Sequence, residues 1–412
     1  MSDYRMAVAT AADTLGFTPG DLGFIADPYP VYAELRDRAP VVFHEATDHW
    51  LVSRYEDVNA LLRDRRMGRT YLHRSSHEEM GREPEPAWHE PFWRLIRAGI
   101  LDMEPPDHTR VRRLVAKAFT PRMVETLRAP IARIVQGLVD GVEGTEFDLI
   151  AAIAEPLPVA VIAELLGVPE VDRGLLRPWS ADICGMYELH PSDDAARLAI
   201  RASEEFSAYL RALARERRAR PKEDLISAMT AVVDEGDRLT EDELVGTCAL
   251  LLNAGHEATV NVTGNGWWAL FRHPLELGRL RKEPTLVSSA IEELMRWDTP
   301  LQLFERWVLE DIEVRGARIA KGAELGLLFG SANRDPAVFA KPDGFDLGRE
   351  PNPHLTFGAG IHFCLGATLA RLELETSFAT VLRRLPNMEL VETPTWKPNY
   401  IIRGLRELRV RG

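Results

Sequence analysis

The segment from residue 240 to residue 271 places the strongest constraint on how this chain can fold. Its apolar residues follow helical spacing, Thr240 and Glu243 form a capping-box pattern at its start, and the sequence RHP ends it after Phe271. A helix of about 32 residues rises roughly 48 Å. The segment therefore predicts a single helix that is long enough to cross a domain of this size.

The middle of this segment contains residues that are unusual in an apolar helix. Gly255, His256, Glu257 and Thr259 all lie within it. A glycine lowers helix stability, and a buried carboxylate costs more. Something must compensate for these costs, and a function is one candidate.

The remaining pattern predicts a mainly helical α+β fold with a small sheet. Helical spacing of apolar residues recurs near 108–119, 121–141, 151–166, 171–189, 194–219, 285–297 and 365–384. The other predicted elements are a short helix in 27–40, a hairpin in 41–55, and strands in 306–325 and at the C-terminus. The polar, proline-bearing stretch 73–93 is expected to be irregular, and loops of that length often cover a site.

The composition favours one globular domain in the cytoplasm. No linker or repeat divides the 412 residues, so a single domain over 1–412 is expected. A net charge of −13 argues against nucleic acid as the main partner. The N-terminal residues lack the basic start and apolar run of a signal peptide, and no apolar run reaches the roughly 20 residues that span a bilayer. A cytoplasmic protein without a membrane partner is therefore expected.

The chain has three cysteines, Cys184, Cys248 and Cys364, and their spacing matches no C-x-x-C, zinc or C-x-x-C-H pattern. We therefore expect neither structural disulfides nor an iron–sulfur cluster. Cys364 lies in HLTFGAGIHFCLGA and has three interpretations. It is a buried structural thiol, as most lone cytosolic cysteines are, or a nucleophile partnered by His362, or a metal-bound thiolate. The second is weak because side chains at i and i+2 need not meet.

Several neighbours of Cys364 favour the metal-bound thiolate. The spacing of Leu365, Leu369 and Leu372 predicts a helix whose N-terminus would stabilise a thiolate. Other residues would let a flat ligand approach the backbone or would keep water from the sulfur, namely Gly358, Gly360, Gly366, Phe357 and Phe363. A thiolate in such a site can hold haem iron and favour O–O cleavage.

The sequence FGAGIHFCLG resembles the F-G-x-G-x-H-x-C-x-G motif of the cytochrome P450 haem-thiolate monooxygenases, and the resemblance extends over nearly the whole chain. It implies the cytochrome P450 fold, a helical domain with a small β-rich region and a long central helix over the haem. It also implies a non-covalent haem b with Cys364 as the axial thiolate and His362 beside a propionate. Further residues that it places at the haem are Phe357, Gly358, Gly366, Ala254 and Gly255.

A charged motif supports this resemblance. Glu293 and Arg296 in EELMR would ordinarily form a surface ion pair of little worth. They match the E-x-x-R motif of the family, and Arg349 in FDLGR matches the third member of that charge cluster. The resemblance implies a structural role, in which the three residues brace the segment that leads to the cysteine.

The helical pattern of EPPDHTRVRRLVAKAF also fits the family. His108 and Arg112 lie roughly 40° apart on one face of such a helix. The resemblance implies that both bind haem propionates, and that Arg306 in FERW occupies a further propionate-binding position.

The opposite face of the same helix gathers Arg110, Arg113 and Lys117. The ordinary interpretation of such a face is a solvated basic surface. On a chain of negative net charge, it is alternatively part of a docking patch for an acidic electron donor, expected to be a ferredoxin. A separate reductase is also expected, because the sequence contains no flavin or nicotinamide motif.

One position departs from the pattern of the family. In AGHEAT, Glu257 matches the acid that relays protons, but Ala258 stands where a threonine is usual. Thr259 lies about 100° further round the helix and does not simply replace it. Some members of the family share this substitution and rely on a substrate hydroxyl and water. We hypothesise the same here, or a water held by Glu257 and Thr259; the alternative is a weakly constrained position with poorer coupling.

The resemblance also places a set of mostly apolar residues around the substrate. Each of them is more often ordinary core when taken singly. They are Trp88, Phe92, Ile183, Tyr187, Leu251, Leu301, Phe304 and Ile401. Together they predict a lipophilic substrate such as a terpenoid, a polyketide or an aromatic compound.

These observations predict a haem-thiolate monooxygenase of secondary metabolism that inserts one atom of O2 into its substrate by hydroxylation or epoxidation. One alternative is a peroxide-driven peroxygenase, which the missing threonine makes conceivable. Another is a non-catalytic haem protein that senses a gas or carries a ligand. Turnover with ferredoxin and reductase, compared with peroxide alone, would separate the three.

Overall fold

The computed structural model of the chain describes residues 15–142, 144–188 and 191–412. The chain groups into two compact units. Unit 1 comprises residues 1–83, 261–364 and 389–411, and unit 2 comprises residues 84–260, 365–388 and 412. The single domain expected over 1–412 stays a prediction, and most of the N-terminal stretch without a signal-peptide pattern lies outside the described residues.

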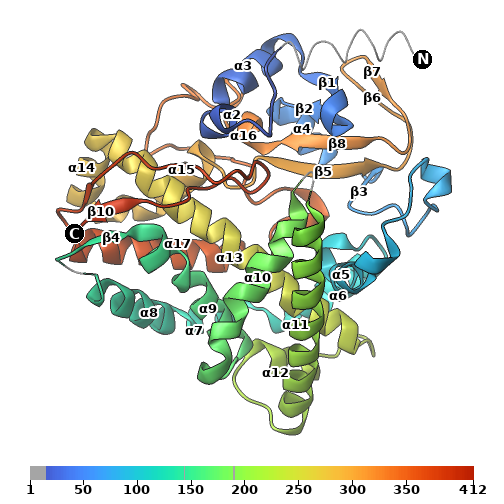
Figure 1. The fold of residues 1–412 in the computed structure, drawn as a ribbon, viewed down its shortest axis with the longest axis horizontal. Helices are drawn as coiled ribbons and strands as arrows, with labels where there is room; N and C mark the ends of the chain where they lie inside the picture. Colours follow the sequence, from blue (N-terminus) through green and yellow to red (C-terminus); the bar gives the residue numbers. More distant parts are fainter. Residues whose placement is uncertain (1–14, 143, 189–190) are drawn as a thin grey trace. The chain divides into compact units, whose positions relative to one another are not determined.

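Unit 1 is built on a sheet whose described strands follow the order β1-β2-β8-β5-β3 (Figure 1). Its strands are β1 (Val41–His44), β2 (His49–Val52), β3 (Met67–Gly68), β5 (Leu303–Val308) and β8 (Glu324–Leu328). β1 and β2 form the hairpin predicted for 41–55. β8 pairs parallel to β2 and antiparallel to β5, which joins segments that lie far apart in the sequence.

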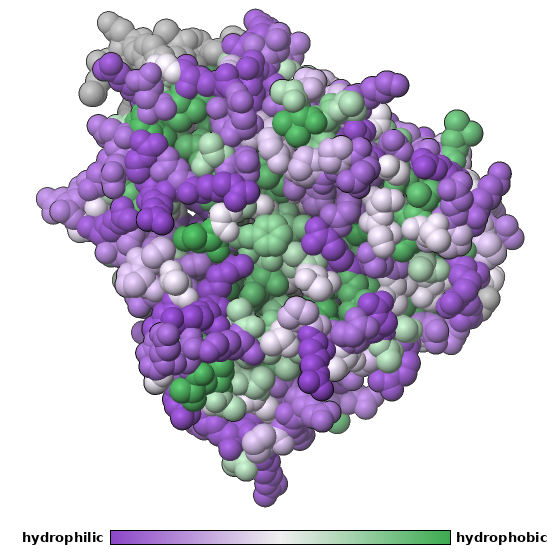
Figure 2. Space-filling model, turned by 180° about the vertical axis from the view of Figure 1, so that it is seen from behind, coloured by the Kyte–Doolittle hydropathy of each residue, from purple (hydrophilic) through white to green (hydrophobic). Residues whose placement is uncertain are grey.

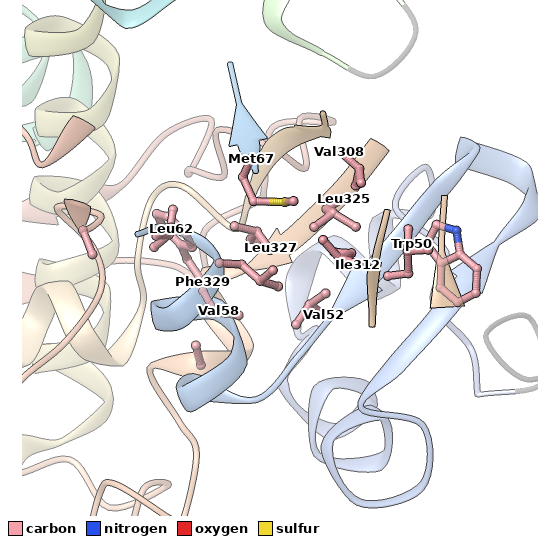
Figure 3. Close-up of a cluster of buried hydrophobic side chains, with 14 of the residues drawn as sticks. Trp50, Val52, Val58, Leu62, Met67, Val308, Ile312, Leu325, Leu327 and Phe329 are labelled. Carbon is pink, nitrogen blue, oxygen red and sulfur yellow. The ribbon is translucent and has the colours of Figure 1, made fainter. Parts of the chain in front are cut away.

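One face of this sheet carries the hydrophobic core of unit 1. Trp50 pairs with Leu325, and Val52 with Leu327, so these side chains point to the same face. They pack with Ile312 and other buried apolar side chains, as Figure 3 shows. Leu51 and Leu328, which point to the other face, are buried as well, so the central strands β2 and β8 are covered on both faces.

Shorter elements complete unit 1. They are α2 (Leu22–Ala26), α3 (Tyr29–Arg38), α4 (Tyr55–Leu61), α14 (Pro274–Lys282), α15 (Val287–Trp297), α16 (Phe329–Ala332), β6 (Ile312–Val314), β7 (Ala317–Ile319), β9 (Glu389–Leu390) and β10 (Arg409–Arg411). These elements confirm the helix predicted in 27–40 and the strands predicted in 306–325 and at the C-terminus.

Unit 2 is mostly helical. Its elements are α5 (Glu90–Arg97), α6 (Asp107–Ala118), α7 (Pro121–Thr126), α8 (Arg128–Asp140), β4 (Glu146–Asp148), α9 (Pro156–Leu166), α10 (Leu176–Cys184), α11 (Asp193–Ala219), α12 (Leu225–Ala231) and α17 (Ala367–Arg384). α10 packs along α11, and α17 along α8 (Figure 1). The patterns at 194–219 and 365–384 thus predicted real helices to within two residues.

Prolines explain where the predicted helices were too long. The pattern 121–141 breaks at Leu127 because Pro130 has no N–H to donate to the carbonyl of Thr126. In 151–166, α9 begins only at Pro156, after a turn of π-helix. In 171–189, α10 begins at Leu176, two residues before a proline, and residue 189 lies outside the described residues. The irregular stretch predicted for 73–93 ends in the first turn of α5, which carries Pro91.

The long helix α13 (Glu241–Arg272) is present as predicted. The backbone N–H of Thr240 donates to the Glu243 carboxylate (2.8 Å), and the N–H of Glu243 donates to the Thr240 hydroxyl (3.1 Å), which is the predicted capping box. Residues up to Val260 belong to unit 2 and the rest to unit 1.

Despite the length of α13, no helix in the described ranges has the length and apolar character needed to cross a membrane. Figure 2 shows one face of the molecule, on which hydrophilic side chains surround smaller hydrophobic patches.

Candidate functional site

The loop that leads to Cys364 is shaped by its own backbone. The N–H of Cys364 donates to the Phe357 carbonyl (2.9 Å), and the N–H of Gly358 donates to the Leu355 carbonyl (2.7 Å). Gly358 and Gly360 have φ values of +67° and +70°, which side-chain-bearing residues rarely adopt. A Cβ on Gly360 would also lie 2.3 Å from the Leu62 carbonyl oxygen. The glycines of the motif are therefore required by this backbone conformation.

Cys184, Cys248 and Cys364 form no disulfide in the described part of the chain, and their surroundings differ. Cys248 is fully buried, and this burial raises the pKa of its thiol, which makes it unreactive. Cys364 is only partly buried and lies three residues before the first residue of α17. Among the three, Cys364 has the surroundings of a metal ligand.

The residues around Cys364 fit a haem. At Gly358 an added Cβ would meet only the His362 carbonyl oxygen, at 4.0 Å, so a flat ligand has room on that side. Phe357 and Phe363 lie with ring centroids 6.3 Å apart. Phe363 is 43% exposed, and its role in keeping water from the sulfur stays a prediction.

Arg306 on β5 is a buried cation, with 2% of its surface exposed. Its guanidinium lies 4.5 Å from the Phe304 ring centroid and donates to the Glu305 carbonyl (2.9 Å). Arg306 lies in the same unit as Cys364, and its role as a propionate partner stays a prediction.

In unit 2, the predicted propionate partners lie one turn apart on α6. His108 is buried, with 2% of its surface exposed, and Arg112 is half-buried. Both follow the N-terminus of α6 at Asp107, so the predicted spacing on one helical face holds.

The opposite face of α6 differs from the prediction of an open basic patch. Arg110 pairs with Glu243, and Lys117 pairs with Asp234. Arg113 also pairs with Asp234, and its Nη1 lies 3.2 Å from Glu235. Hydrogen bonds from Lys117 and Arg113 lower the pKa of the Asp234 carboxyl. Acidic residues of the 234–243 segment therefore compensate most of this positive charge.

The middle of α13 presents one partly uncovered face. Leu251 and Ala258 are half-buried and Ala254 is exposed, and these residues fall within about 60° of one another on the helix. A Cβ on Gly255 would lie 3.1 Å from Ile162 Cδ1, so close packing of α9 accounts for this glycine. The buried His256 places its Nδ1 3.1 Å from the Ser180 hydroxyl. Packing thus explains two of the four unusual residues.

Glu257 and Thr259 do not share a face of α13. The helix is continuous through them, so they lie on opposite flanks of Ala258, about 160° apart. Glu257 is half-buried, whereas Thr259 is buried at 6% exposure. This separation does not favour one water held by both side chains, and the roles of Glu257 and Thr259 in proton transfer stay predictions.

The predicted charge cluster is fully assembled in unit 1. Arg296 forms a bidentate pair with Glu293 (2.7 and 2.8 Å), and Arg349 donates to the same carboxylate (3.0 Å). Glu293 and Arg296 have no exposed surface, which excludes an ordinary surface pair. Burial lowers the pKa of Arg296. Because the carboxylate and its two arginines satisfy one another, the cluster is a rigid structural element.

Two residues that the sequence reasoning missed connect this cluster to the cysteine loop. Arg296 donates to the backbone carbonyl of Asn333 (3.0 Å). The side-chain oxygen of Asn333 accepts from the Leu355 N–H (2.7 Å). Thr356 donates to the Met295 carbonyl (2.8 Å) and accepts from Asn333 (3.1 Å). Their only sequence signal is polarity within apolar surroundings.

The structure brings some predicted substrate residues together within each unit. In unit 1, the Gln302 N–H donates to the Ile401 carbonyl (3.0 Å), which places Ile401 beside Leu301. In unit 2, the ring centroids of Phe92 and Tyr187 lie 6.4 Å apart.

Two other predicted substrate residues of unit 2 differ in how far they are exposed. Ile183 is fully buried, which is what a core residue requires. Trp88 is 41% exposed, and the Arg197 guanidinium lies 5.0 Å from its ring centroid.

A cavity of about 310 Å³ lies within unit 2, where sequence reasoning did not expect one. Its wall is formed by α5, α11 and the start of α13. The lining residues are Pro91, Arg94, Leu95, Ala98, Ser203, Glu204, Ser207, Ala208, Arg211, Asp242 and Val245, and none of the predicted substrate residues is among them.

Comparisons with known proteins identify the family of the chain. The family model described as Cytochrome P450 matches residues 186–395. The chain is 40% identical over 405 residues to the cytochrome P450 monooxygenase PikC of Streptomyces venezuelae, covering 95% of this chain and 93% of the relative. It is 36% identical to the polyketide biosynthesis cytochrome P450 PksS of Bacillus subtilis, covering 97% and 99%.

Solved structures of cytochromes P450 are also similar to this chain. The crystal structure of P450BioI in complex with a hexadec-9Z-enoic acid ligated acyl carrier protein has a TM-score of 0.87 and 37% identity, covering 95% of this chain and 99% of that chain. The PksS structure also has a TM-score of 0.87.

Proposed function

The chain belongs to the cytochrome P450 family of haem-thiolate monooxygenases, and from that premise we propose that it hydroxylates or epoxidises a lipophilic small molecule of secondary metabolism. Cys364 is the axial thiolate of a non-covalent haem b, and the haem supplies the activation of O2. The observation that carries the proposal is the cysteine loop, in which two left-handed glycines and the bond to the Phe357 carbonyl hold a partly exposed thiol before α17.

Four cationic or potentially cationic residues hold the haem propionates in this proposal. They are His108, Arg112, Arg306 and His362. The burial of His108 and Arg306 supports the assignment, because both polar side chains are almost withdrawn from water. Phe357, Gly358, Gly366 and Ala254 would contact the haem in this proposal, whereas Gly255 serves the packing of α9.

Glu257 delivers protons during turnover, with water and a substrate hydroxyl taking the place of the usual threonine. The half-buried position of Glu257 beside the uncovered face of α13 supports this role. Ala258 leaves space for a substrate group or water where a threonine side chain would stand.

The substrate is a polyketide or a fatty-acyl chain. The predicted walls around Leu301, Ile401, Phe92 and Tyr187 are apolar apart from one phenol. PksS is a cytochrome P450 of polyketide biosynthesis, and the P450BioI complex contains a carrier-bound acyl chain, which supports this class. A carrier-bound substrate is the second candidate, favoured by the P450BioI complex alone.

An acidic ferredoxin, reduced by a separate reductase, supplies the electrons. Because the Arg110, Arg113 and Lys117 face is largely compensated, we place its docking surface at the cysteine loop of unit 1. Ile361 and Phe363 are 47% and 43% exposed there, and the Leu62–Arg63 backbone packs against Gly360. Arg63 and Arg65 are exposed in the same segment and provide positive charge.

The test is turnover of the purified holoenzyme with lipophilic candidates. Polyketides, fatty acids and their acyl-carrier thioesters are titrated while the Soret band is followed, and binders are then incubated with ferredoxin, reductase and O2. Oxygenated product with the donor system supports the proposal. Product with hydrogen peroxide alone identifies a peroxygenase, and binding without product under either condition identifies a ligand-binding protein.

The docking surface has its own control. Arg63→Glu with Arg65→Glu is expected to slow ferredoxin-driven turnover at least tenfold, and to leave the Soret titration unchanged. Arg113→Glu is expected to have a smaller effect. The reverse order would return the docking surface to the outer face of α6.

A further inference from the structure

One face of the unit 1 sheet brings three potential metal ligands together on neighbouring strands. His49 on β2 pairs with Glu324 on β8, and Glu324 pairs with Trp307 on β5. Paired residues point to the same face, as do residues two apart along a strand, so Glu305 shares this face. We propose that His49, Glu305 and Glu324 bind a divalent metal ion of the zinc type.

The distances suit a site that contracts slightly around an ion. Nε2 of His49 lies 3.8 Å from Glu305 Oε1 and 3.8 Å from Glu324 Oε2. The three potential ligand atoms all lie within 4.8 Å of one another. With zinc–ligand bonds of about 2.0–2.2 Å, tetrahedral ligands lie roughly 3.4 Å apart. Small side-chain rotations achieve this contraction.

The histidine ring is oriented as in a metal site. His49 is 6% exposed, and its Nδ1 bonds to the Thr47 carbonyl, which can only accept, so Nδ1 carries the proton. Within the described part of the chain, Nε2 has no hydrogen-bond partner. A neutral ring then directs its Nε2 lone pair at two carboxylates. Metal-binding histidines commonly donate their other N–H to a backbone carbonyl in this way.

The surrounding charges also favour a cation. Arg69 approaches the second oxygen of Glu305 (Nη1 to Oε2, 3.8 Å), which leaves Oε1 directed at His49. Arg82 pairs with Asp48 (2.8 Å). Asp48 and Glu305 thus each lie beside a guanidinium, whereas the ion pair seen for Glu324 in the described residues is with His49, which leaves the Glu324 carboxyl available to a metal ion.

Access and coordination are compatible with an exchangeable ion. The side chains of Glu305 and Glu324 are 31% and 16% exposed, so solvent reaches the site from the carboxylate side. One nitrogen and two carboxylates leave a fourth position for water, and this ligand set suits Zn²⁺ among the first-row ions. The ion would link three adjacent strands and so stabilise the sheet of unit 1.

The test measures zinc in the haem-loaded protein. Chelator-treated holoenzyme is dialysed against Zn²⁺ and analysed for zinc and iron, and its thermal unfolding is followed with and without Zn²⁺. We expect one zinc per chain with a dissociation constant of about 10 μM or tighter, and a rise in Tm of about 2–6 °C at a hundredfold excess over that constant. Zinc K-edge X-ray absorption should show nitrogen and oxygen ligands only.

Variants separate this site from other zinc-binding groups. His49→Gln, Glu324→Gln and the more exposed Glu305→Gln should each weaken zinc binding at least tenfold with an unchanged Soret band. The matched controls His73→Gln and Glu310→Gln alter exposed residues nearby and should bind as the parent does. Unchanged binding in the ligand variants, a sulfur ligand at about 2.3 Å, or no zinc retained at all would each overturn the proposal.

Discussion

The cysteine loop and the middle of α13 differ in how they are held. The loop is connected to α15 through Thr356 and Asn333, and the Glu293 carboxylate behind it accepts from two arginines. The uncovered face of α13 instead presents small or apolar side chains at Leu251, Ala254 and Ala258. We infer that the protein fixes the position of its cofactor through this network. The position of water beside α13 depends instead on the substrate that is bound.

The largest effect is expected from Glu293→Gln, which would test whether the cluster is needed. Removal of the charge leaves Arg296 buried without a carboxylate, which costs about 3–5 kcal/mol. We expect a large fall in haem-loaded protein per chain, measured from the Soret absorbance, and a lower denaturation midpoint. Glu283→Gln, the same change at an exposed residue, should leave both unchanged. Normal loading and stability in Glu293→Gln would show that the loop holds its shape without the cluster.

Next in size is the effect of Glu257→Gln on turnover. A proton-transfer residue typically contributes about 10²–10⁴-fold, so ferredoxin-driven turnover should fall at least a hundredfold while the Soret titration stays unchanged. Thr259→Val should change turnover by less than about threefold, because this side chain is buried on the other flank of α13. Equal losses in the two variants would contradict the assignment of proton delivery to Glu257 alone.

A smaller effect is expected from Ala258→Thr, which restores the usual hydroxyl of the family. One hydrogen bond is worth about 0.5–1.5 kcal/mol, so the ratio of hydrogen peroxide to oxygenated product should change about two- to tenfold. Ala258→Val adds the same bulk without the hydroxyl and serves as the matched control. If both variants shift the ratio alike, the effect is steric, and if neither does so on the true substrate, the hypothesis fails.

The smallest effect concerns a buried glutamate for which no arginine partner is seen among the described residues. Burial raises the pKa of Glu373 on α17 to about 8, well above the value of about 4.3 expected in the unfolded chain. Between these values the unfolded chain releases a proton that the folded protein retains, so this contribution to stability is lost as pH rises from about 4.5 to 8. The slope is at most about 1.4 kcal/mol per pH unit. Urea unfolding at pH 5.5 and 7.5 should show a smaller pH dependence in Glu373→Gln, and an identical dependence would contradict the raised pKa.

The sequence predicted those parts of the molecule in which local pattern and backbone chemistry act together. The capping box of Thr240 and Glu243, the hairpin in 41–55 and the glycine loop before Cys364 each depend on residues close together in the chain. Helix ends were predicted less well, because apolar periodicity continues across prolines such as Pro130 and Pro156 that break the hydrogen-bonding pattern.

Features that depend on contacts between distant segments could not be predicted from the sequence. The pairing of Arg113 and Lys117 with Asp234 joins residues more than a hundred positions apart, so the face appeared to be an open basic patch. The role of Asn333, and the meeting of His49 with Glu305 and Glu324, likewise depend on strand and loop neighbours that no periodicity reveals. Gly255 showed that a correctly noticed residue can serve packing against Ile162.

The most direct test of the account is iron K-edge X-ray absorption on the purified holoenzyme and three cysteine variants. We predict one sulfur ligand on iron in the parent protein, in Cys184→Ser and in Cys248→Ser, and its loss in Cys364→Ser alone. A sulfur ligand that persists in Cys364→Ser, or that disappears with either of the other two cysteines, would contradict the assignment of Cys364 as the thiolate that holds the haem iron.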